Sequence, residues 1–204
     1  SRLAVGTSVD PRFVRRHHDS LYMREKVNAI FRPATEDDLE SILEILNLEI
    51  LTSASNFHWE PRALAELEQE WVAAQGSYPW LVFEHDGVLG GFAKASAFRS
   101  KQAYGWTAEV TIYLAPLARG QGLGQVLYKA LLEELKLRGF HLAIGAITRP
   151  NAASESLHSS LGFRQIGVLP EVGWKMGAWH DVSYWAKQLK DGPADDRLLP
   201  EPRA

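Results

Sequence analysis

The stretch Arg119-Gly120-Gln121-Gly122-Leu123-Gly124 places three glycines between a strand-like run that ends at Leu114 and an amphipathic segment over 122–138. Glycines let a backbone approach a bulky anion, and the unpaired amides at the start of a helix carry partial positive charge. The stretch therefore favours a pyrophosphate site, with a plain strand-to-helix turn as the alternative. Two nucleotide motifs are excluded, because no Gly-Lys-Ser/Thr follows and Leu127 stands where a G-x-G-x-x-G motif needs its last glycine.

The segments around this turn show patterns typical of strands and helices. Asp86-Gly87 predicts a tight hairpin between two strands, because glycine tolerates the positive φ that such turns need. An antiparallel meander that leads into a strand, helix, strand crossover makes this an α+β domain. The predicted strands cover 27–32, 80–84, 88–95, 107–114, 141–147, 165–169 and 182–186, and the predicted helices begin near 35 and 61 or cover 122–138 and 151–161.

The composition limits the class of protein. With 204 residues, of which 46% are hydrophobic, the chain can bury one core, and we expect a single domain over 27–189. The net charge of −3 argues against a nucleic-acid partner, and no apolar run reaches the roughly 20 residues of a membrane span. Cysteine is absent and the seven histidines show no ligand spacing, so we expect no disulfide and no metal. The cytoplasm is the expected location.

The two ends differ from the rest of the chain. We expect 1–26 to be a flexible extension and Met23 to be the natural start, with the residues before it either foreign to the native protein or part of that extension. A basic targeting segment is the alternative, because arginine-rich stretches suit transit peptides. Residues 190–204 carry three prolines and clustered charges, which is typical of a flexible tail.

Two motifs resemble those of the GCN5-related N-acetyltransferase (GNAT) superfamily. Arg119, Gly122 and Gly124 match its R/Q-x-x-G-x-G/A signature, and 151–163 resembles its N-x-x-A-x-x-L-Y-x-x-x-G-F helix, with His158 in place of tyrosine. This resemblance implies the GNAT fold, a central mixed, mostly antiparallel sheet of six to seven strands flanked by about four helices and splayed between the fourth and fifth strands. Shorter motifs over 27–189 resemble the phosphinothricin and methionine sulfoximine acetyltransferases: Asn56-Phe57, Tyr78-Pro79-Trp80-Leu81-Val82, Tyr104-Gly105-Trp106-Thr107-Ala108-Glu109, Ile112-Tyr113-Leu114 and Gly177-Ala178-Trp179-His180-Asp181-Val182.

The resemblance implies acetyl-CoA as the cosubstrate, held in the gap of the splayed sheet. Residues 112–114 would bind the acetyl-pantetheine end, 119–125 the pyrophosphate and Asn151 the pantetheine arm. In the superfamily the fourth strand also carries a bulge, which turns amides toward the ligand. The implied cofactor residues are Ile112, Tyr113, Leu114, Arg119, Gly120, Gln121, Gly122, Leu123, Gly124, Gln125 and Asn151.

Acetyl transfer to an amine needs a neutral nitrogen, a polarised thioester carbonyl and release of a thiolate. An alkyl ammonium has a pKa near that of lysine, about 10.4, so a base must remove its proton at neutral pH. Glu109, where the related enzymes place a catalytic glutamate, is the expected base, and a surface carboxylate on an alternating strand is the alternative. The resemblance implies that the backbone amides around Tyr113 and Leu114 stabilise the carbonyl oxygen. His158 is either the acid that protonates the thiolate or a hydrogen-bonded histidine packed beneath the cofactor.

The expected substrate side is basic and aromatic. Arg99 and Lys101 would pair with the acid group of an amino acid, with a solvated surface pair as the alternative. Lys94 stands where phosphinothricin-acetylating members carry an aromatic residue, so a third cation would change the pocket's size or charge preference. The expected substrate residues are Phe57, Arg99, Lys101, Tyr104, Glu109 and Thr111.

The expected function is transfer of acetyl from acetyl-CoA to the primary amine of a small amino-acid-like substrate, of the phosphinothricin, methionine sulfoximine or methionine sulfone type. The alternatives are a GNAT that acetylates a protein N-terminus or a lysine, and a non-catalytic acyl-CoA-binding regulator. A homodimer is also expected, because the run over 179–185 carries aromatics suited to an interface.

Overall fold

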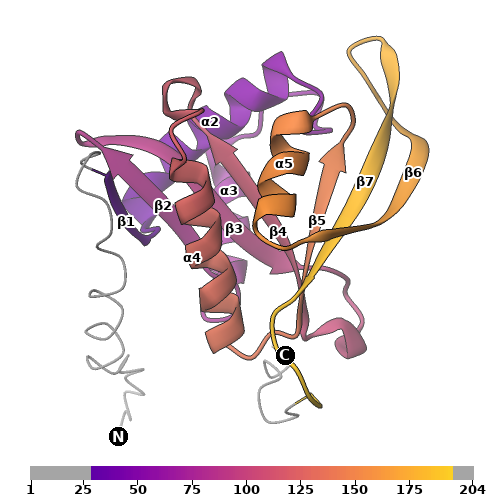
Figure 1. The fold of residues 1–204 in the computed structure, drawn as a ribbon. Coiled ribbons are helices and arrows are strands. Elements are labelled where there is room, and N and C mark those ends of the chain that lie inside the picture. Colours follow the sequence, from indigo (N-terminus) through magenta and orange to yellow (C-terminus); the bar gives the residue numbers. More distant parts are fainter. Residues whose placement is uncertain (1–28, 195–204) are drawn as a thin grey trace, which may run out of the picture.

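The computed structural model describes residues 29–194, in which seven strands form one sheet in the order β1-β2-β3-β4-β5-β7-β6 (Figure 1). The predictions for 1–26 and for 195–204 lie outside the described residues. The strands are β1 (Ala29–Pro33), β2 (Trp80–His85), β3 (Val88–Ala97), β4 (Thr107–Leu114), β5 (Leu142–Thr148), β6 (Arg164–Lys175) and β7 (Ala178–Gln188). The helices are α2 (Leu39–Thr52), α3 (Leu64–Ala74), α4 (Leu123–Leu137) and α5 (Ala152–Ser160), with short 3-10 turns η1 (Glu36–Asp38), η2 (Gln102–Tyr104) and η3 (Pro116–Ala118).

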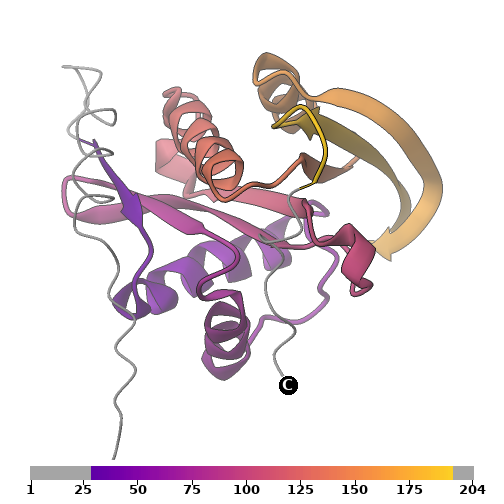
Figure 2. The ribbon, with the colours of Figure 1, turned by 90° about the horizontal axis from the view of Figure 1, so that it is seen from below.

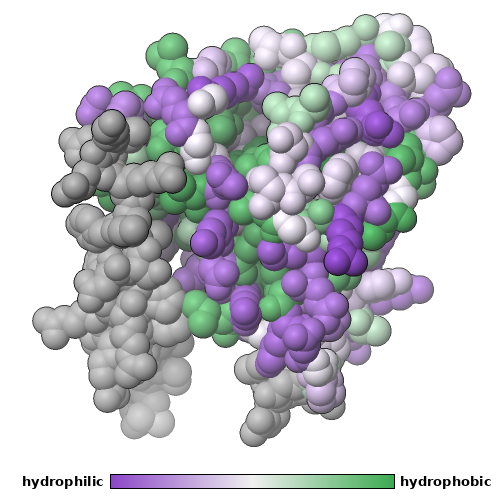
Figure 3. Space-filling model, in the orientation of Figure 1, coloured by the Kyte–Doolittle hydropathy of each residue, from purple (hydrophilic) through white to green (hydrophobic). Residues whose placement is uncertain are grey.

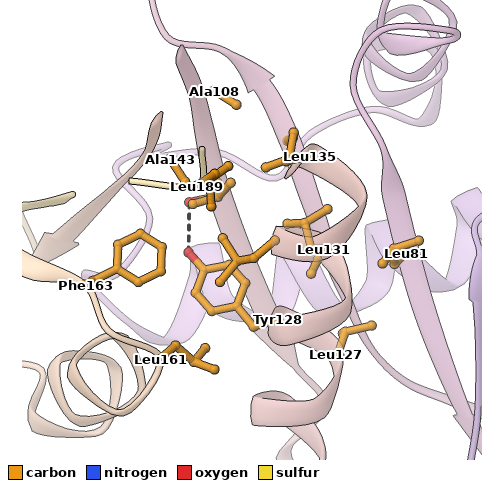
Figure 4. Packing of buried hydrophobic residues seen from close by; sticks show 14 of the residues in the cluster. Leu81, Ala108, Leu127, Tyr128, Leu131, Leu135, Ala143, Leu161, Phe163 and Leu189 are labelled. Atoms are coloured by element: carbon orange, nitrogen blue, oxygen red, sulfur yellow. Dashed lines mark hydrogen bonds between the residues drawn. The ribbon is translucent and has the colours of Figure 1, made fainter. Parts of the chain in front are cut away.

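The sheet separates two helical layers, with α2 and α3 on one face and α4 and α5 on the other (Figure 2). Each layer buries its own hydrophobic cluster against the sheet. Figure 4 shows the cluster beneath α4, where Tyr128 and Leu131 pack among side chains from the sheet and from the segment after α5. Because successive strand residues point to opposite faces, β4 directs Val110 toward α4 and Tyr113 toward α2 and α3.

The predicted splay between the fourth and fifth strands is confirmed. The parallel pairing of β4 with β5 is confined to 107–109 against 142–144, whereas β5 pairs with β7 along its whole length. Beyond Glu109 the two strands diverge. The bulge that the resemblance implied in β4 is absent, because β4 pairs with β3 in unbroken register from Ala108 to Leu114. The splay therefore arises where β4 leaves β5, and not from an inserted residue.

The last two strands are longer than the predicted 165–169 and 182–186. Most of β6 is exposed, so burial imposes no alternating pattern on it, and Pro170 and Gly173 weaken its strand signal. The hairpin is closed instead by a tight turn in which Met176 and Gly177 have φ of 51° and 75°. Methionine is rare at positive φ, so sequence rules do not predict this turn. The same rules do predict the turn at Asp86-Gly87, where φ is 52° and 77°.

Candidate active site

A cleft of about 680 Å³ occupies the gap between the diverging strands. Its walls come from β4, the segment before α4, the start of α5 and the loop after α2. It contains nine of the eleven predicted cofactor residues; the side chain of Gln121 and the buried Leu123 lie outside it. The three predicted catalytic residues, Glu109, Leu114 and His158, also line it. The splay therefore brings both sets of residues into one cavity.

The glycine turn leaves its main chain open. Gly120 and Gly122 have φ of 75° and 77°, and a Cβ added to either would meet no atom within 4 Å. Within the described part of the chain, the amides of 120–122 make no backbone hydrogen bond, and the first turn of α4 adds further unpaired N–H groups. The residues present therefore fit a diphosphate of the kind that coenzyme A carries. Arg119 adds a guanidinium whose side chain is 53% exposed.

One amide near the end of β4 faces the gap. The N–H of Ala115 donates to the carbonyl of Gly90, and hydrogen-bonded pairs alternate along an antiparallel ladder. The N–H of Tyr113 therefore points to β3, while that of Leu114 points away from β3 toward the splay. The carbonyl of Leu114, on the same side of the strand as its N–H, accepts from Nε of Arg119 at 3.1 Å. This geometry singles out Leu114 from the pair that the sequence indicated.

Glu109 lies at the point where β4 leaves β5. Its side chain is part-buried, on the face of β4 opposite α4, and it opens into the cleft. Burial raises the pKa of Glu109 above its ordinary value, and the charges of Arg99 and Lys94 oppose this rise. A carboxylate with a raised pKa is a stronger base than an exposed one.

His158 is buried, and both of its ring nitrogens are hydrogen-bonded. Nδ1 lies 2.8 Å from the carbonyl oxygen of Ser154, which can only accept, so Nδ1 carries the proton. In the neutral ring, Nε2 then accepts from the hydroxyl of Tyr128 at 3.0 Å. Burial lowers the pKa of His158, and the bond to Ser154 opposes this. The ring also packs edge-on against Phe163 with centroids 4.9 Å apart, which matches the packed alternative for this residue.

The predicted substrate residues fall into two groups. Phe57, Glu109 and Thr111 line the cleft, and Phe57 packs tightly over Gly173 of β6. Arg99, Lys101 and Tyr104 are exposed, and they belong to the segment between β3 and β4, outside the cleft.

Asn151 caps α5, because its side-chain oxygen accepts from the N–H of Ser154 at 3.1 Å. Lys94 is not a free cation, because its ammonium pairs with Glu70 and lies 4.7 Å from the ring centroid of Trp80. Glu70 also accepts from Arg62, at 2.6 Å. The third cation that the sequence indicated is therefore paired with a carboxylate of α3, which it shares with Arg62.

The cleft also contains residues that sequence reasoning missed. Glu49 of α2 accepts from Nη2 of Arg119 at 2.9 Å, and Tyr128 of α4 bonds His158. Glu49 could have been noticed in the sequence, because a charged residue at this position interrupts the apolar stripe formed by Ile42, Leu46 and Ile50. Tyr128 gave no such signal, because an aromatic residue on a helix face reads as ordinary core.

Comparisons with known proteins identify the family. The model of the Acetyltransferase (GNAT) family matches residues 41–163. The chain belongs to this family. It is 38% identical over 159 residues to phosphinothricin N-acetyltransferase of Streptomyces viridochromogenes, covering 78% of this chain and 87% of the relative. It is 35% identical over 168 residues to L-methionine sulfoximine/L-methionine sulfone acetyltransferase of Salmonella typhimurium, covering 81% and 97%.

A solved structure resembles the fold in detail. The GNAT superfamily phosphinothricin acetyltransferase from Sinorhizobium meliloti, in complex with AcCoA, has a TM-score of 0.81 and 32% identity over 85% of this chain and 96% of its own. The protein is therefore a GNAT N-acetyltransferase that uses acetyl-CoA. Within residues 29–194 no cluster of His, Asp or Glu is arranged to hold a metal ion, and no helix is long and apolar enough to cross a membrane.

Proposed function

We propose that this acetyltransferase acetylates the primary amine of a small amino-acid-like substrate with Glu109 as the general base. One observation carries the proposal: the part-buried Glu109 carboxylate, with its raised pKa, shares a cleft with the Leu114 amide and the open glycine turn. Related enzymes with 35–38% identity are named for phosphinothricin, methionine sulfoximine and methionine sulfone. The named substrates of these relatives support an amino acid with a polar oxoacid-like or sulfoximine-like end as the substrate of this enzyme.

Acetyl-CoA supplies the thioester whose carbonyl carbon accepts the amine and whose sulfur leaves as a thiolate. Glu109 removes the proton from the substrate ammonium, directly or through one water, so that the nitrogen forms the new amide bond. The N–H of Leu114 stabilises the carbonyl oxygen, an effect typically worth a few kcal/mol for one donor. The His158 and Tyr128 pair, both lining the cleft, is assigned the proton that the thiolate takes up. The C–N bond forms as the C–S bond breaks, and the nitrogen loses a second proton that restores the one the pair gives to the thiolate. Glu109 then releases the first proton to solvent, so protons and charges balance.

The other residues of the site would bind the cofactor or the substrate. Open amides of 120–124 and the side chains of Arg119 and Gln125 would hold the diphosphate, and Asn151 the pantetheine arm. Phe57 and Thr111 would wall the substrate. Arg99, which acts electrostatically on Glu109 from the exposed loop, would attract the substrate's acid group, with Lys101 and Tyr104 beside it.

The test is thiol release from acetyl-CoA with methionine sulfoximine, methionine sulfone, phosphinothricin, free amino acids and a peptide. Turnover of the small amines is expected. Turnover with the peptide alone would make the enzyme a protein acetyltransferase, and coenzyme A binding without turnover would make it a regulator. Glu109→Gln should lower kcat by roughly 10²–10⁴-fold. Glu133→Gln, an exposed change on α4, is the control, and an unchanged rate and pH profile in Glu109→Gln would remove Glu109 from the mechanism.

We also propose that the enzyme forms a homodimer through the hairpin of β6 and β7. β6 is the edge strand of the sheet, and a free strand edge favours pairing with another chain. The right side of Figure 3, where β6 runs, mixes hydrophobic and polar surface. The exposed apolar side chains of the β6 and β7 hairpin include Ile166, Leu169, Val172, Trp174 and Trp179. Sedimentation equilibrium should give a dimer that Val172→Asp converts to a monomer, and a wild-type monomer at every concentration would exclude this assembly.

A further inference from the structure

Glu49 is a buried carboxylate that the proposed mechanism does not use. It lies on the inner face of α2 with 9% of its surface exposed, and it lines the cleft. One oxygen accepts from the hydroxyls of Ser53, at 2.5 Å, and Ser55, and the other accepts from Arg119. Burial would raise the pKa of Glu49, but these hydroxyls and the Arg119 guanidinium outweigh it and hold the pKa below its ordinary value. The group is therefore an anion with fixed partners.

Arg119 connects this anion to the end of β4. Its Nη2 donates to Glu49 while its Nε donates to the carbonyl of Leu114, so one planar guanidinium spans both elements. A guanidinium has five N–H donors, so three remain for another ligand, and Glu49 need not release Arg119 when phosphates bind. Glu49 therefore orients Arg119 and leaves N–H donors of its guanidinium available to a phosphate.

The carbonyl of Leu114 is the group that this bridge holds. The side chain of Leu114 is confined as well, because a Cβ on Gly91 or Gly124 would lie 2.6 Å or 2.8 Å from its methyl carbons. Packing against two glycines places the residue, and within residues 29–194 the bond from Arg119 is the hydrogen bond that its backbone carbonyl accepts outside the sheet. The carbonyl and the N–H of Leu114 belong to successive planar peptide groups that meet at its Cα, so a bond that holds the carbonyl restricts the backbone rotation at Leu114 and, through it, the direction of the N–H.

We propose that Glu49 is a positioning residue for acetyl transfer, which acts through Arg119 to hold the backbone of Leu114 in the conformation that directs its N–H into the cleft. The inference rests on the proposed role of the Leu114 amide. Glu49 touches no reacting atom in this scheme. Its effect on the reaction should therefore disappear when Arg119 is absent, whereas a purely structural effect on α2 should not.

The experiment is a double-mutant cycle with Glu49→Gln, Arg119→Gln and the double variant, read as kcat/KM for acetyl-CoA. Glu49→Gln should lower kcat/KM by about tenfold in the wild-type background, as expected for the loss of a charged hydrogen-bond partner. In the Arg119→Gln background the same change should cost less than about twofold. Glu44→Gln, on the exposed side of α2, is the matched control. Equal losses in both backgrounds would overturn the inference.

Hydrogen exchange of the protein without ligand supplies a readout that needs no amine substrate. Glu49→Gln should speed amide exchange in peptides that cover 112–119 by about tenfold, and Ser55→Ala should do so more weakly, at a temperature where each variant is fully folded. Unchanged exchange in both variants would overturn the inference even if activity falls. If the wild type acetylates none of the amines tested, the proposed function fails, while faster exchange would still support the Glu49 to Leu114 connection.

Discussion

Replacing Gly145 with alanine is expected to break the contact that seats His158 beside the cleft. Gly145 lies in the middle of β5, directly beneath the imidazole ring. A Cβ at this position would lie 2.5 Å from Nε2 and 2.9 Å from Cδ2 of His158, closer than real Cβ contacts come. The ring cannot swing aside cheaply, because Ser154 and Tyr128 hold its two nitrogens at 2.8 Å and 3.0 Å.

The size of the effect follows from three contributions. Overpacking a tight core site costs about 1–3 kcal/mol. Loss of the Tyr128 bond costs a further ~0.5–1.5 kcal/mol. The lower entropy of an unfolded alanine chain returns about 0.4–1 kcal/mol. We therefore expect Gly145→Ala to lower the free energy of unfolding by roughly 0.5–4 kcal/mol, with a fall in Tm of about 2–4 °C for each kcal/mol in a domain of this size.

The assay is urea unfolding followed by tryptophan fluorescence, with thermal melting alongside. Gly167→Ala in β6 is the matched control, because a Cβ there meets nothing within 4 Å and the strand conformation suits alanine. This control should stay within about 0.5 kcal/mol of the wild type or exceed it. His158→Ala removes the obstructing ring, so adding Gly145→Ala in that background should hardly change the free energy of unfolding.

Two results would refute this reasoning. The first is a Gly145→Ala protein as stable as Gly167→Ala, which would mean that α5 moves away freely. The second is a cost of Gly145→Ala that is the same with and without the His158 ring, since residues in contact should show coupling well above the roughly 0.5 kcal/mol scatter of independent sites.

Three further changes test other parts of the molecule. Gly91→Ala puts a Cβ 2.6 Å from the Leu114 side chain and 2.8 Å from the carbonyl oxygen of Tyr113. Both kcat and the free energy of unfolding should therefore fall, the latter by about 1–3 kcal/mol in urea unfolding. Wild-type values for both would contradict this. Lys94→Met removes a cation that lowers the pKa of Glu109, so the acidic limb of the kcat/KM profile should move to higher pH, and an unmoved limb would count against Glu109 as the base. Arg32→Ala removes the guanidinium 2.7 Å from the buried Asp38 carboxylate, whose pKa is lowered despite burial by the bonds from Arg32 and Thr35. The folded-state pKa is lowered, so this stabilisation of about 1–3 kcal/mol is present above the ordinary Asp pKa of about 3.9 and is lost as the pH falls through the lower folded-state pKa. The deficit of Arg32→Ala in urea unfolding should therefore be larger at pH 7 than at pH 3, and an equal deficit at both would contradict this.

The local features were predictable because each depends on residues that are neighbours in the chain. Asp86-Gly87 specifies a hairpin through its own φ preferences, and the glycines at 120 and 122 specify an open turn in the same way. The fold followed from two motifs, because their order and separation match one family. Residues close to those motifs, such as Glu109 and Leu114, were placed in the cleft by the same comparison.

The tertiary structure decided everything that depends on distant segments meeting. Lys175 donates to the carbonyl of Ile50, 125 residues away, and Glu49 meets Arg119 across 70 residues. No local pattern encodes such a pair, because its geometry exists only after the sheet has assembled between the two helical layers.

The same limit explains the substrate residues. Residue type indicated a basic, aromatic pocket, but only the path of the chain between β3 and β4 showed that Arg99, Lys101 and Tyr104 lie outside the cleft. It also showed that Lys94 is already paired with Glu70. The sequence by itself determined the fold family and the phosphate-binding turn, because both depend on residues that are contiguous in the chain. Which charges are free and which are neutralised was decided by three-dimensional contact, since a charge is neutralised by whatever lies beside it in space.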